Sequence, residues 1–157
     1  MNTKSTGNKN SRKVELSARK ESYCISFNAM ASPCEVLIET DSPVLANKLG
    51  LAVANEVWRI EDKYSRYSAS SACSQINQSA GKPVLIDQET FLLLNFAEQC
   101  YQLSNGVFDL TSGVFRKAWF FDGSDNIPTK QQVNAHLPYI GWHKVLYDQY
   151  QITLAQG

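Results

Sequence analysis

The chain reads N-G-V-F-D-L-T-S-G-V-F-R-K-A-W-F-F at residues 105–121, where a single acidic residue stands among apolar neighbours and glycines lie on both sides of it. Glycine permits backbone turns that bulkier residues avoid. Asp109 has two interpretations: an Asp shortly before Thr111 and an apolar run is a common helix N-cap, and a carboxylate at a turn also suits a bound ligand. The residues alone leave both open.

A predicted helix leads directly into this stretch. Asp87 is expected to cap its N-terminus, and Asn105-Gly106 to end it with a left-handed cap. Apolar residues at helical spacing predict the face that packs in the core: Leu93, Phe96, Ala97, Cys100 and Leu103. The packing of this helix should determine where Asp109 points.

A longer amphipathic helix, of about twenty residues, is predicted from Ser42, the expected N-cap, and Pro43 at the first helical position, through Tyr64. Its predicted core face comprises Leu45, Leu49, Ala52, Val53, Val57, Ile60 and Tyr64. Opposite charges three and four residues apart support its solvated side: Glu56 with Arg59, and Asp62 with Arg66.

Short apolar or β-branched runs predict strands in the rest of the chain, at residues 23–27, 34–39, 84–86, 144–147 and 151–154. Pro33 is expected to break the ladder between the first two, and the short strand at 84–86 to be buried. These patterns predict an α+β fold, with two main helices packed against a mostly antiparallel sheet of short strands.

Length and composition favour one globular domain, because 157 residues of which 43% are hydrophobic can bury a sizeable core. Residues 1–20 hold six Lys or Arg against a single Glu, and we expect them to form a disordered basic leader. The leader lacks interleaved aromatic residues, which argues against a nucleic-acid partner. It also lacks the apolar run of a secretory signal, so a cytoplasmic location is expected.

Several common catalytic patterns are missing from the sequence. It has no phosphate-binding G-x-x-x-x-G-K-[ST], no G-x-G-x-x-G, no G-x-S-x-G and no H-E-x-x-H. Its four cysteines do not have zinc-ligand spacing. The residues therefore assign no catalytic group and no metal ligand.

Four blocks of the chain, taken in order, resemble the amino-terminal half of the ApbE-type FAD:protein FMN transferases. They are F-N-A-M-A-S-P-C-E at 27–35, W-R-I-E-D-K-Y-S-R-Y-S-A-S-S-A-C-S-Q-I-N at 58–77, G-V-F-D-L-T-S-G-V at 106–114 and I-G-W-H-K-V at 140–145. The resemblance implies an incomplete ApbE-like, T-fold-related fold, with residues 21–157 as its amino-terminal part. In that family a D-L-G-G-x-A-K-G segment and most of the magnesium ligands follow, beyond the position of Gly157.

The resemblance also implies which residues contact the flavin of FAD: Met30, Tyr67, Val107, Phe108 and Asp109. The residues alone leave other roles open. Met30 also suits a gap in the core, and Tyr67 also suits a loop side chain folded back onto the core. Val107 replaces the Ala that is usual in the family, so a larger side chain is expected to crowd the ligand there.

The function implied is transfer of FMN from FAD to a Thr or Ser of an acceptor flavoprotein, with release of AMP and with magnesium bound mostly by the second half. The alternative is a non-catalytic truncated relative that acts as a flavin-binding or protein-interaction module. Phe115, Trp119 and Phe120 form an apolar group suited to core packing or to packing between the two halves, so self-association or pairing with a second half is expected.

Overall fold

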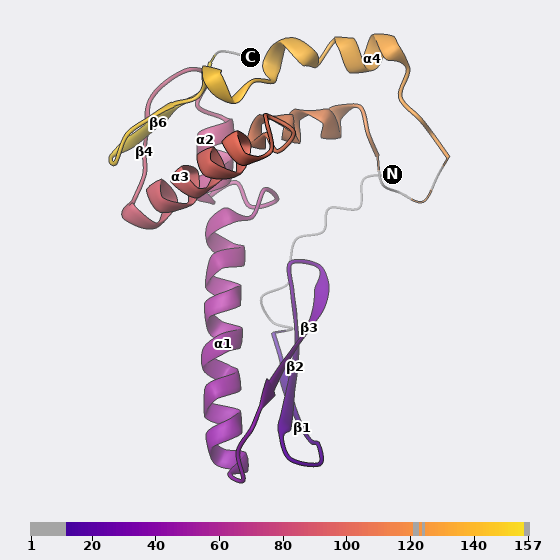
Figure 1. The fold of residues 1–157 in the computed structure, drawn as a ribbon, viewed down its shortest axis with the longest axis vertical. Helices are drawn as coiled ribbons and strands as arrows, with labels where there is room; N and C mark the ends of the chain where they lie inside the picture. Colours follow the sequence, from indigo (N-terminus) through magenta and orange to yellow (C-terminus); the bar gives the residue numbers. More distant parts are fainter. Residues whose placement is uncertain (1–11, 121–122, 124, 156–157) are drawn as a thin grey trace. The chain divides into compact units, whose positions relative to one another are not determined.

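The computed structural model describes residues 12–120, 123 and 125–155. The chain divides into two compact units, residues 1–74 and 75–157. Figure 1 shows the elements of each unit in sequence colours. The short helix α2 (Ala72–Asn77) spans the boundary in the sequence.

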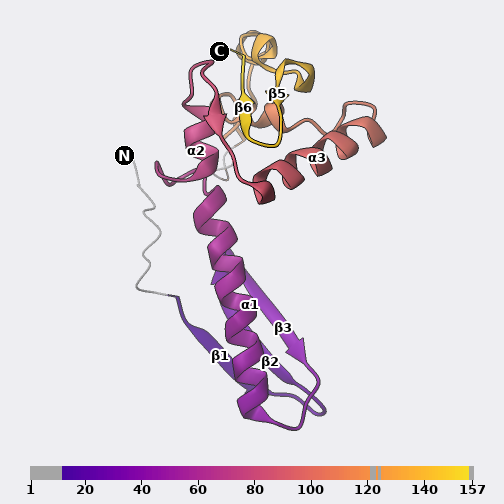
Figure 2. The ribbon, with the colours of Figure 1, turned by 90° about the vertical axis from the view of Figure 1, so that its left-hand side faces the viewer.

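The first unit is a three-stranded antiparallel sheet with one long helix along its face. The strands β1 (Val14–Ala18), β2 (Tyr23–Ala29) and β3 (Ser32–Ile38) lie in the order β1-β2-β3. Helix α1 (Pro43–Tyr64) lies along this sheet, as Figure 2 shows. The Ser42 hydroxyl accepts a hydrogen bond from the Leu45 amide at 3.2 Å, which confirms the predicted N-cap.

The prediction that residues 1–20 form a disordered leader is wrong at its C-terminal end. Residues 1–11 lie outside the described residues, but β1 begins at Val14 and pairs with β2 along its whole length. The free edge of β2 explains this, because each of its unpaired backbone groups gains a partner in a ladder. β1 is an edge strand with exposed polar side chains, so its sequence resembles that of a coil.

Pro33 was expected to interrupt the ladder but lies inside β3, opposite Asn28. β3 is an edge strand, where a missing N–H costs no ladder bond if it faces outward. In a two-residue hairpin the pair that closes the loop, here Ala29–Ser32, is hydrogen-bonded, and the next pair, Asn28–Pro33, is of the non-hydrogen-bonded kind, whose N–H groups face outward. Pro33 is therefore accommodated without loss of pairing.

The face of α1 that packs on the sheet differs from the predicted one. Its buried residues are Ala46, Gly50, Ala54 and Trp58, spaced four apart, while Leu45, Leu49 and Val53 are exposed. A Cβ placed on Gly50 would come within 2.3 Å of Ile25 Cγ1. Small residues therefore let the helix axis approach β2, and the larger apolar residues occupy the neighbouring face.

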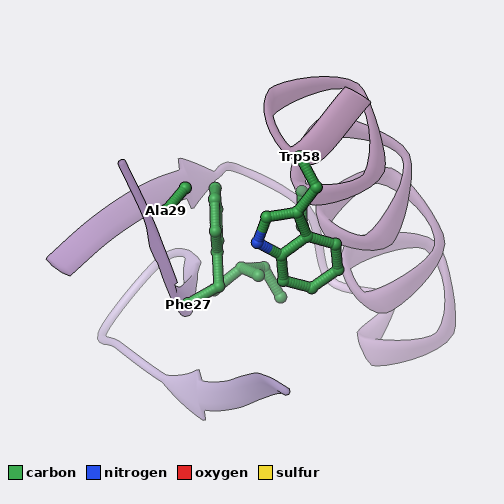
Figure 3. Packing of buried hydrophobic residues seen from close by; sticks show 5 residues of the cluster. Phe27, Ala29 and Trp58 are labelled. Carbon is green, nitrogen blue, oxygen red and sulfur yellow. The ribbon is translucent and has the colours of Figure 1, made fainter. Parts of the chain in front are cut away.

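The core of this unit lies between β2 and α1. Ile25, Phe27 and Ala29 alternate along β2 and are buried against Ala54 and Trp58. Figure 3 shows the Trp58 side chain pointing from α1 towards Phe27, and the two rings meet edge to face at 5.8 Å and 77°. This contact fixes the C-terminal part of α1 over the end of β2.

The second unit combines helix α3 (Gln88–Leu103) with a second antiparallel sheet. That sheet has the order β4-β6-β5, from β4 (Val84–Leu85), β5 (Leu146–Tyr147) and β6 (Gln151–Thr153). Short helices complete the unit: the 3-10 helix η2 (Leu110–Lys117), α4 (Lys130–Asn134), η3 (Leu137–Tyr139) and η4 (Trp142–Lys144). The predicted α+β fold with antiparallel strands is confirmed, and the strands form two sheets.

The predicted caps of α3 are confirmed, and its predicted core face is confirmed only at Ala97. The Asp87 carboxylate accepts from the Thr90 amide at 3.0 Å, and Asn105 and Gly106 both have positive φ at the other end. The buried apolar residues of α3 are Leu94 and Ala97, which pack with Trp142 and Ile152. Leu93, Phe96 and Leu103 are 47%, 64% and 86% exposed, and Leu85 of β4, predicted to be buried, is 84% exposed.

Among the described residues, the helices are too short or too polar to cross a bilayer.

Candidate functional site

Met30 occupies the tip of the β2–β3 hairpin in an unusual backbone conformation. Ala29 pairs with Ser32, so Met30 and Ala31 form a two-residue loop, and their φ angles are 52° and 59°. Positive φ at both positions defines a type I′ turn, which normally contains Asn or Gly. Met30 is 56% exposed, so the alternative of a gap-filling core residue is wrong.

Two side chains of α1 hold this hairpin. The Trp58 indole N–H donates to the Asn28 carbonyl at 2.8 Å, and the Met30 amide donates to Glu61 Oε1 at 2.7 Å. Neither backbone group is used by the neighbouring strands, because β1 pairing ends at Phe27 and Met30 lies in the loop. The exposed tip of the hairpin is therefore tied to the helix.

Arg12 extends this network from the residues before β1. Its guanidinium forms a two-bond contact with Asp62, at 3.0 and 2.8 Å, and a 3.3 Å bond with Glu61 Oε2. It also lies over the Trp58 ring at 5.4 Å. The pKa of Arg12 is raised, chiefly by its hydrogen bond to Asp62, so it remains charged.

Tyr67 lies in the Ser-rich segment that follows α1. Its side chain is 73% exposed, with the Arg66 guanidinium 4.6 Å from the ring centroid and hydrogen-bonded to the hydroxyl. The alternative that Tyr67 folds back onto the core is therefore wrong. One ring face is in contact with a cation, and the exposed ring is of the kind that stacks on planar ligands.

Asp109 is the N-cap of η2, and both of its carboxylate oxygens have partners. Oδ1 accepts from the Thr111 amide at 2.8 Å and from the Thr111 hydroxyl at 2.6 Å. Oδ2 accepts from the Trp142 amide at 3.1 Å, and the Gly141 amide donates to the Thr111 hydroxyl at 2.8 Å. The helix-cap interpretation is confirmed, and the cap also joins the G-V-F-D-L-T-S-G-V and I-G-W-H-K-V blocks.

Val107 and Phe108 follow the left-handed end of α3. Their side chains are 88% and 44% exposed. The Phe108 amide donates to the Ser104 hydroxyl at 2.8 Å, which holds the segment against the end of the helix. Val107 thus projects from the described part of its unit.

The structure brings Val107, Phe108 and Asp109 together in the second unit, and it places Met30 and Tyr67 in the first. Sequence reasoning missed Arg12, Glu61 and Thr111 as supporting residues. Glu61 lies within a quoted block, but its partner Met30 is 31 residues away. No local pattern signals such a pair, whereas the link from Asp109 to Trp142 joins two blocks already recognised.

Near the Asp109 cap, Trp142 also donates from its indole N–H to the Glu98 carboxylate of α3. The pKa of Glu98 is lowered, first by its hydrogen bond from Gln102 and then by that from Trp142. Burial raises the pKa of the neighbouring Tyr147 hydroxyl. Trp142 thus connects Asp109 and α3 through its backbone and its ring.

The resemblance implies a magnesium ion, which the protein would hold with oxygen ligands. No three His, Cys, Asp or Glu side chains of the described part of the chain converge as a metal site. A hard cation needs several oxygen ligands. Residues 12–120, 123 and 125–155 do not by themselves fit the metal.

A family model described as the ApbE family matches residues 30–157. The chain belongs to the ApbE family. A curated FAD:protein FMN transferase from Chlamydia muridarum (strain MoPn / Nigg) is 26% identical over 97 residues, which make up 60% of this chain and 31% of that protein. The match relates the chain to the flavin transferases.

Solved ApbE structures share the fold. The ApbE protein from Thermotoga maritima superposes with a TM-score of 0.76 at 22% identity, over 85% of this chain and 45% of that one. For the flavin transferase ApbE from Vibrio cholerae the TM-score is 0.69 at 19% identity, over 90% of this chain and 46% of that one. The chain thus spans less than half the length of these ApbE proteins.

Proposed function

We propose that this chain contributes part of the FAD-binding surface of an FAD:protein FMN transferase. Met30, Tyr67 and the Val107–Asp109 segment are the proposed flavin contacts. The observation that carries the proposal is the exposed Met30 at the tip of a type I′ hairpin in a chain of the ApbE family. Positive φ at a non-glycine residue costs about 1 kcal/mol or more and persists where its surroundings impose it, often at ligand sites.

Tyr67 supports the proposal through its accessibility. Arg66 lies over one face of the ring, and the side chain as a whole is 73% exposed. Stacking of a planar ligand on such a ring gains apolar contact and leaves the hydroxyl in water. A neighbouring guanidinium also favours a ligand that carries phosphate groups.

Asp109 has a more specific role than a free carboxylate. Its oxygens accept three hydrogen bonds from Thr111 and Trp142, so its first task is to fix the loop. We propose that this fixed loop presents the exposed side chains of Val107 and Phe108 to the flavin. The Val in place of the family's usual Ala is compatible with this role, because Val107 projects outward with 88% exposure.

The proposed reaction cleaves the pyrophosphate of FAD, transfers FMN to a Thr or Ser hydroxyl of an acceptor protein and releases AMP. A bound magnesium ion would neutralise pyrophosphate charge in this chemistry. The residues of this chain would contribute recognition and orientation of the flavin. We propose that the metal ligands belong to the part of the ApbE proteins that this chain does not cover.

Titration of the protein with FAD, followed by flavin fluorescence anisotropy, tests the binding surface. Tyr67→Ala and Met30→Ala should each weaken binding by about tenfold, the effect of losing roughly 1.4 kcal/mol of contact. Matched controls are Tyr150→Ala in the second unit and Leu37→Ala in the first, which remove exposed side chains of similar size. Equal affinity of all four variants would refute the proposed site.

A second pair of variants separates the two roles of Asp109. Asp109→Ala should weaken FAD binding, whereas Asp87→Ala removes a cap with the same Thr amide and hydroxyl contacts and should leave affinity unchanged. Similar loss of stability with similar FAD affinity in the two variants would make Asp109 a helix cap alone.

A further inference from the structure

We infer that Glu61 is a positioning residue that holds the Met30 hairpin in its ligand-facing conformation, and that Arg12 in turn fixes Glu61. The inference rests on the proposed contact between Met30 and the flavin. It begins with the Met30 amide, which lies in the two-residue loop and has no partner in the strand ladder. Glu61 Oε1 accepts that amide at 2.7 Å.

The position of Glu61 on α1 matches the spacing of the hairpin. Trp58 and Glu61 are three residues apart, on one side of the helix, and contact Asn28 and Met30, which are two apart. Three helical residues rise about 4.5 Å and two strand residues about 6.6 Å, within the reach of these two side chains. The helix thus binds the end of β2 and its turn at two successive points.

The second oxygen of Glu61 is held as well. Glu61 Oε2 accepts from Arg12 at 3.3 Å, and Arg12 is itself bound by both oxygens of Asp62. The Glu61 and Arg12 side chains are only 29% and 26% exposed. The Glu61 carboxylate has both oxygens hydrogen-bonded and is partly shielded from water, so its side chain is already held in place when the turn forms. Its hydrogen bond can therefore stabilise a backbone conformation that Met30 would not adopt alone.

Glu56, another acidic residue of α1, provides a contrast. Glu56 pairs with Arg59 one turn away on the same helix, and its side chain is 61% exposed. That pair adds to the helix alone. Glu61 instead joins three separate segments, because its partners lie 31 and 49 residues away along the chain.

Loss of the Glu61 carboxylate should leave the Met30 amide to water and allow the turn to leave its type I′ conformation. Met30 would then spend less time in the position that contacts the flavin. Glu61→Gln loses the charge that attracts Arg12 but retains a side-chain oxygen that can accept from the Met30 N–H. It should therefore hold the turn nearly as well as Glu61 does. Arg12→Gln should give a smaller loss, because Arg12 does not contact Met30 itself and acts through Glu61 and the Trp58 ring.

Two measurements on the whole chain test the inference: FAD titration by flavin anisotropy and hydrogen exchange of the Met30 amide by NMR. Glu61→Ala should accelerate exchange at Met30 and weaken FAD binding, each by about tenfold or more, the scale expected for a hydrogen bond to a charged group. Glu61→Gln should stay within about threefold of the parent protein in both. Glu56→Ala is the matched control and should change neither.

The two measurements distinguish a failure of this inference from a failure of the proposed function. If the parent protein does not bind FAD, the flavin site is refuted, and exchange at Met30 alone decides whether Glu61 holds the turn. If FAD binds but Glu61→Ala binds it as tightly as Glu56→Ala does, Glu61 does not position the flavin contact. Unchanged Met30 exchange in Glu61→Ala overturns the inference in either case.

Discussion

Replacing Gly50 by Ala probes the closest approach of helix to sheet in the first unit. An added Cβ would lie 2.3, 2.7 and 2.8 Å from Cγ1, Cγ2 and Cδ1 of Ile25. Ile25 has no exposed surface, and a β-branched side chain has few rotamers to move into. The helix must therefore move away from β2 or Ile25 must adopt a strained conformation.

The magnitude follows from two opposing effects. Overpacking a core position costs about 1–3 kcal/mol, and three contacts this short indicate the upper part of that range. Ala in place of Gly within a helix returns about 1 kcal/mol. Gly50→Ala should therefore lower the free energy of unfolding by about 2 kcal/mol, which corresponds to a fall in Tm of about 4–8 °C.

Urea denaturation followed by far-ultraviolet circular dichroism measures the change, with Asn47→Ala, on the exposed side of the same helix, as a control for helix propensity. The cause is checked in an Ile25→Ala background, where the obstructing atoms are absent. There Gly50→Ala should become stabilising. A substitution that stabilises the parent protein, or that destabilises both backgrounds equally, would refute the close-packing argument.

Two further predictions concern the second unit. Hydrogen bonds from Gln102 and Trp142 lower the pKa of Glu98 below its ordinary value of 4.5. Their contribution to stability is therefore complete above that value and is lost as the pH falls through the lowered pKa. Gln102→Ala should raise the Glu98 pKa in a carboxyl NMR titration, and an unchanged pKa would contradict the assignment. Leu92, Phe96 and Leu103 expose 56%, 64% and 86% of their surface along α3, so the isolated chain should self-associate at micromolar concentration, and Phe96→Gln should reduce the association. Size-exclusion chromatography with light scattering measures the self-association, and a monomer at every concentration would argue against association through the exposed face of α3.

The sequence by itself determined the features that depend on neighbours a few residues away. The Ser42 cap, the Asp87 cap and the left-handed Asn105-Gly106 end of α3 are each satisfied within about one helical turn, and all three were predicted. The Asp109 cap is of the same kind, and the structure selected it from two open interpretations. The family blocks likewise indicated the candidate flavin contacts, including the Val107–Asp109 segment.

Only the tertiary structure decided which surfaces are buried and which distant groups meet. The large apolar residues predicted which face of α1 and of α3 would pack, but Gly50 and its small neighbours pack on β2, and Leu94 joins the predicted Ala97 beside Trp142. The burial of a helix face depends on the shape of the surface opposite, which periodicity does not contain. Strand β1 and the contact between Glu61 and Met30 depend on partners far along the chain, so no local sequence signal reveals them.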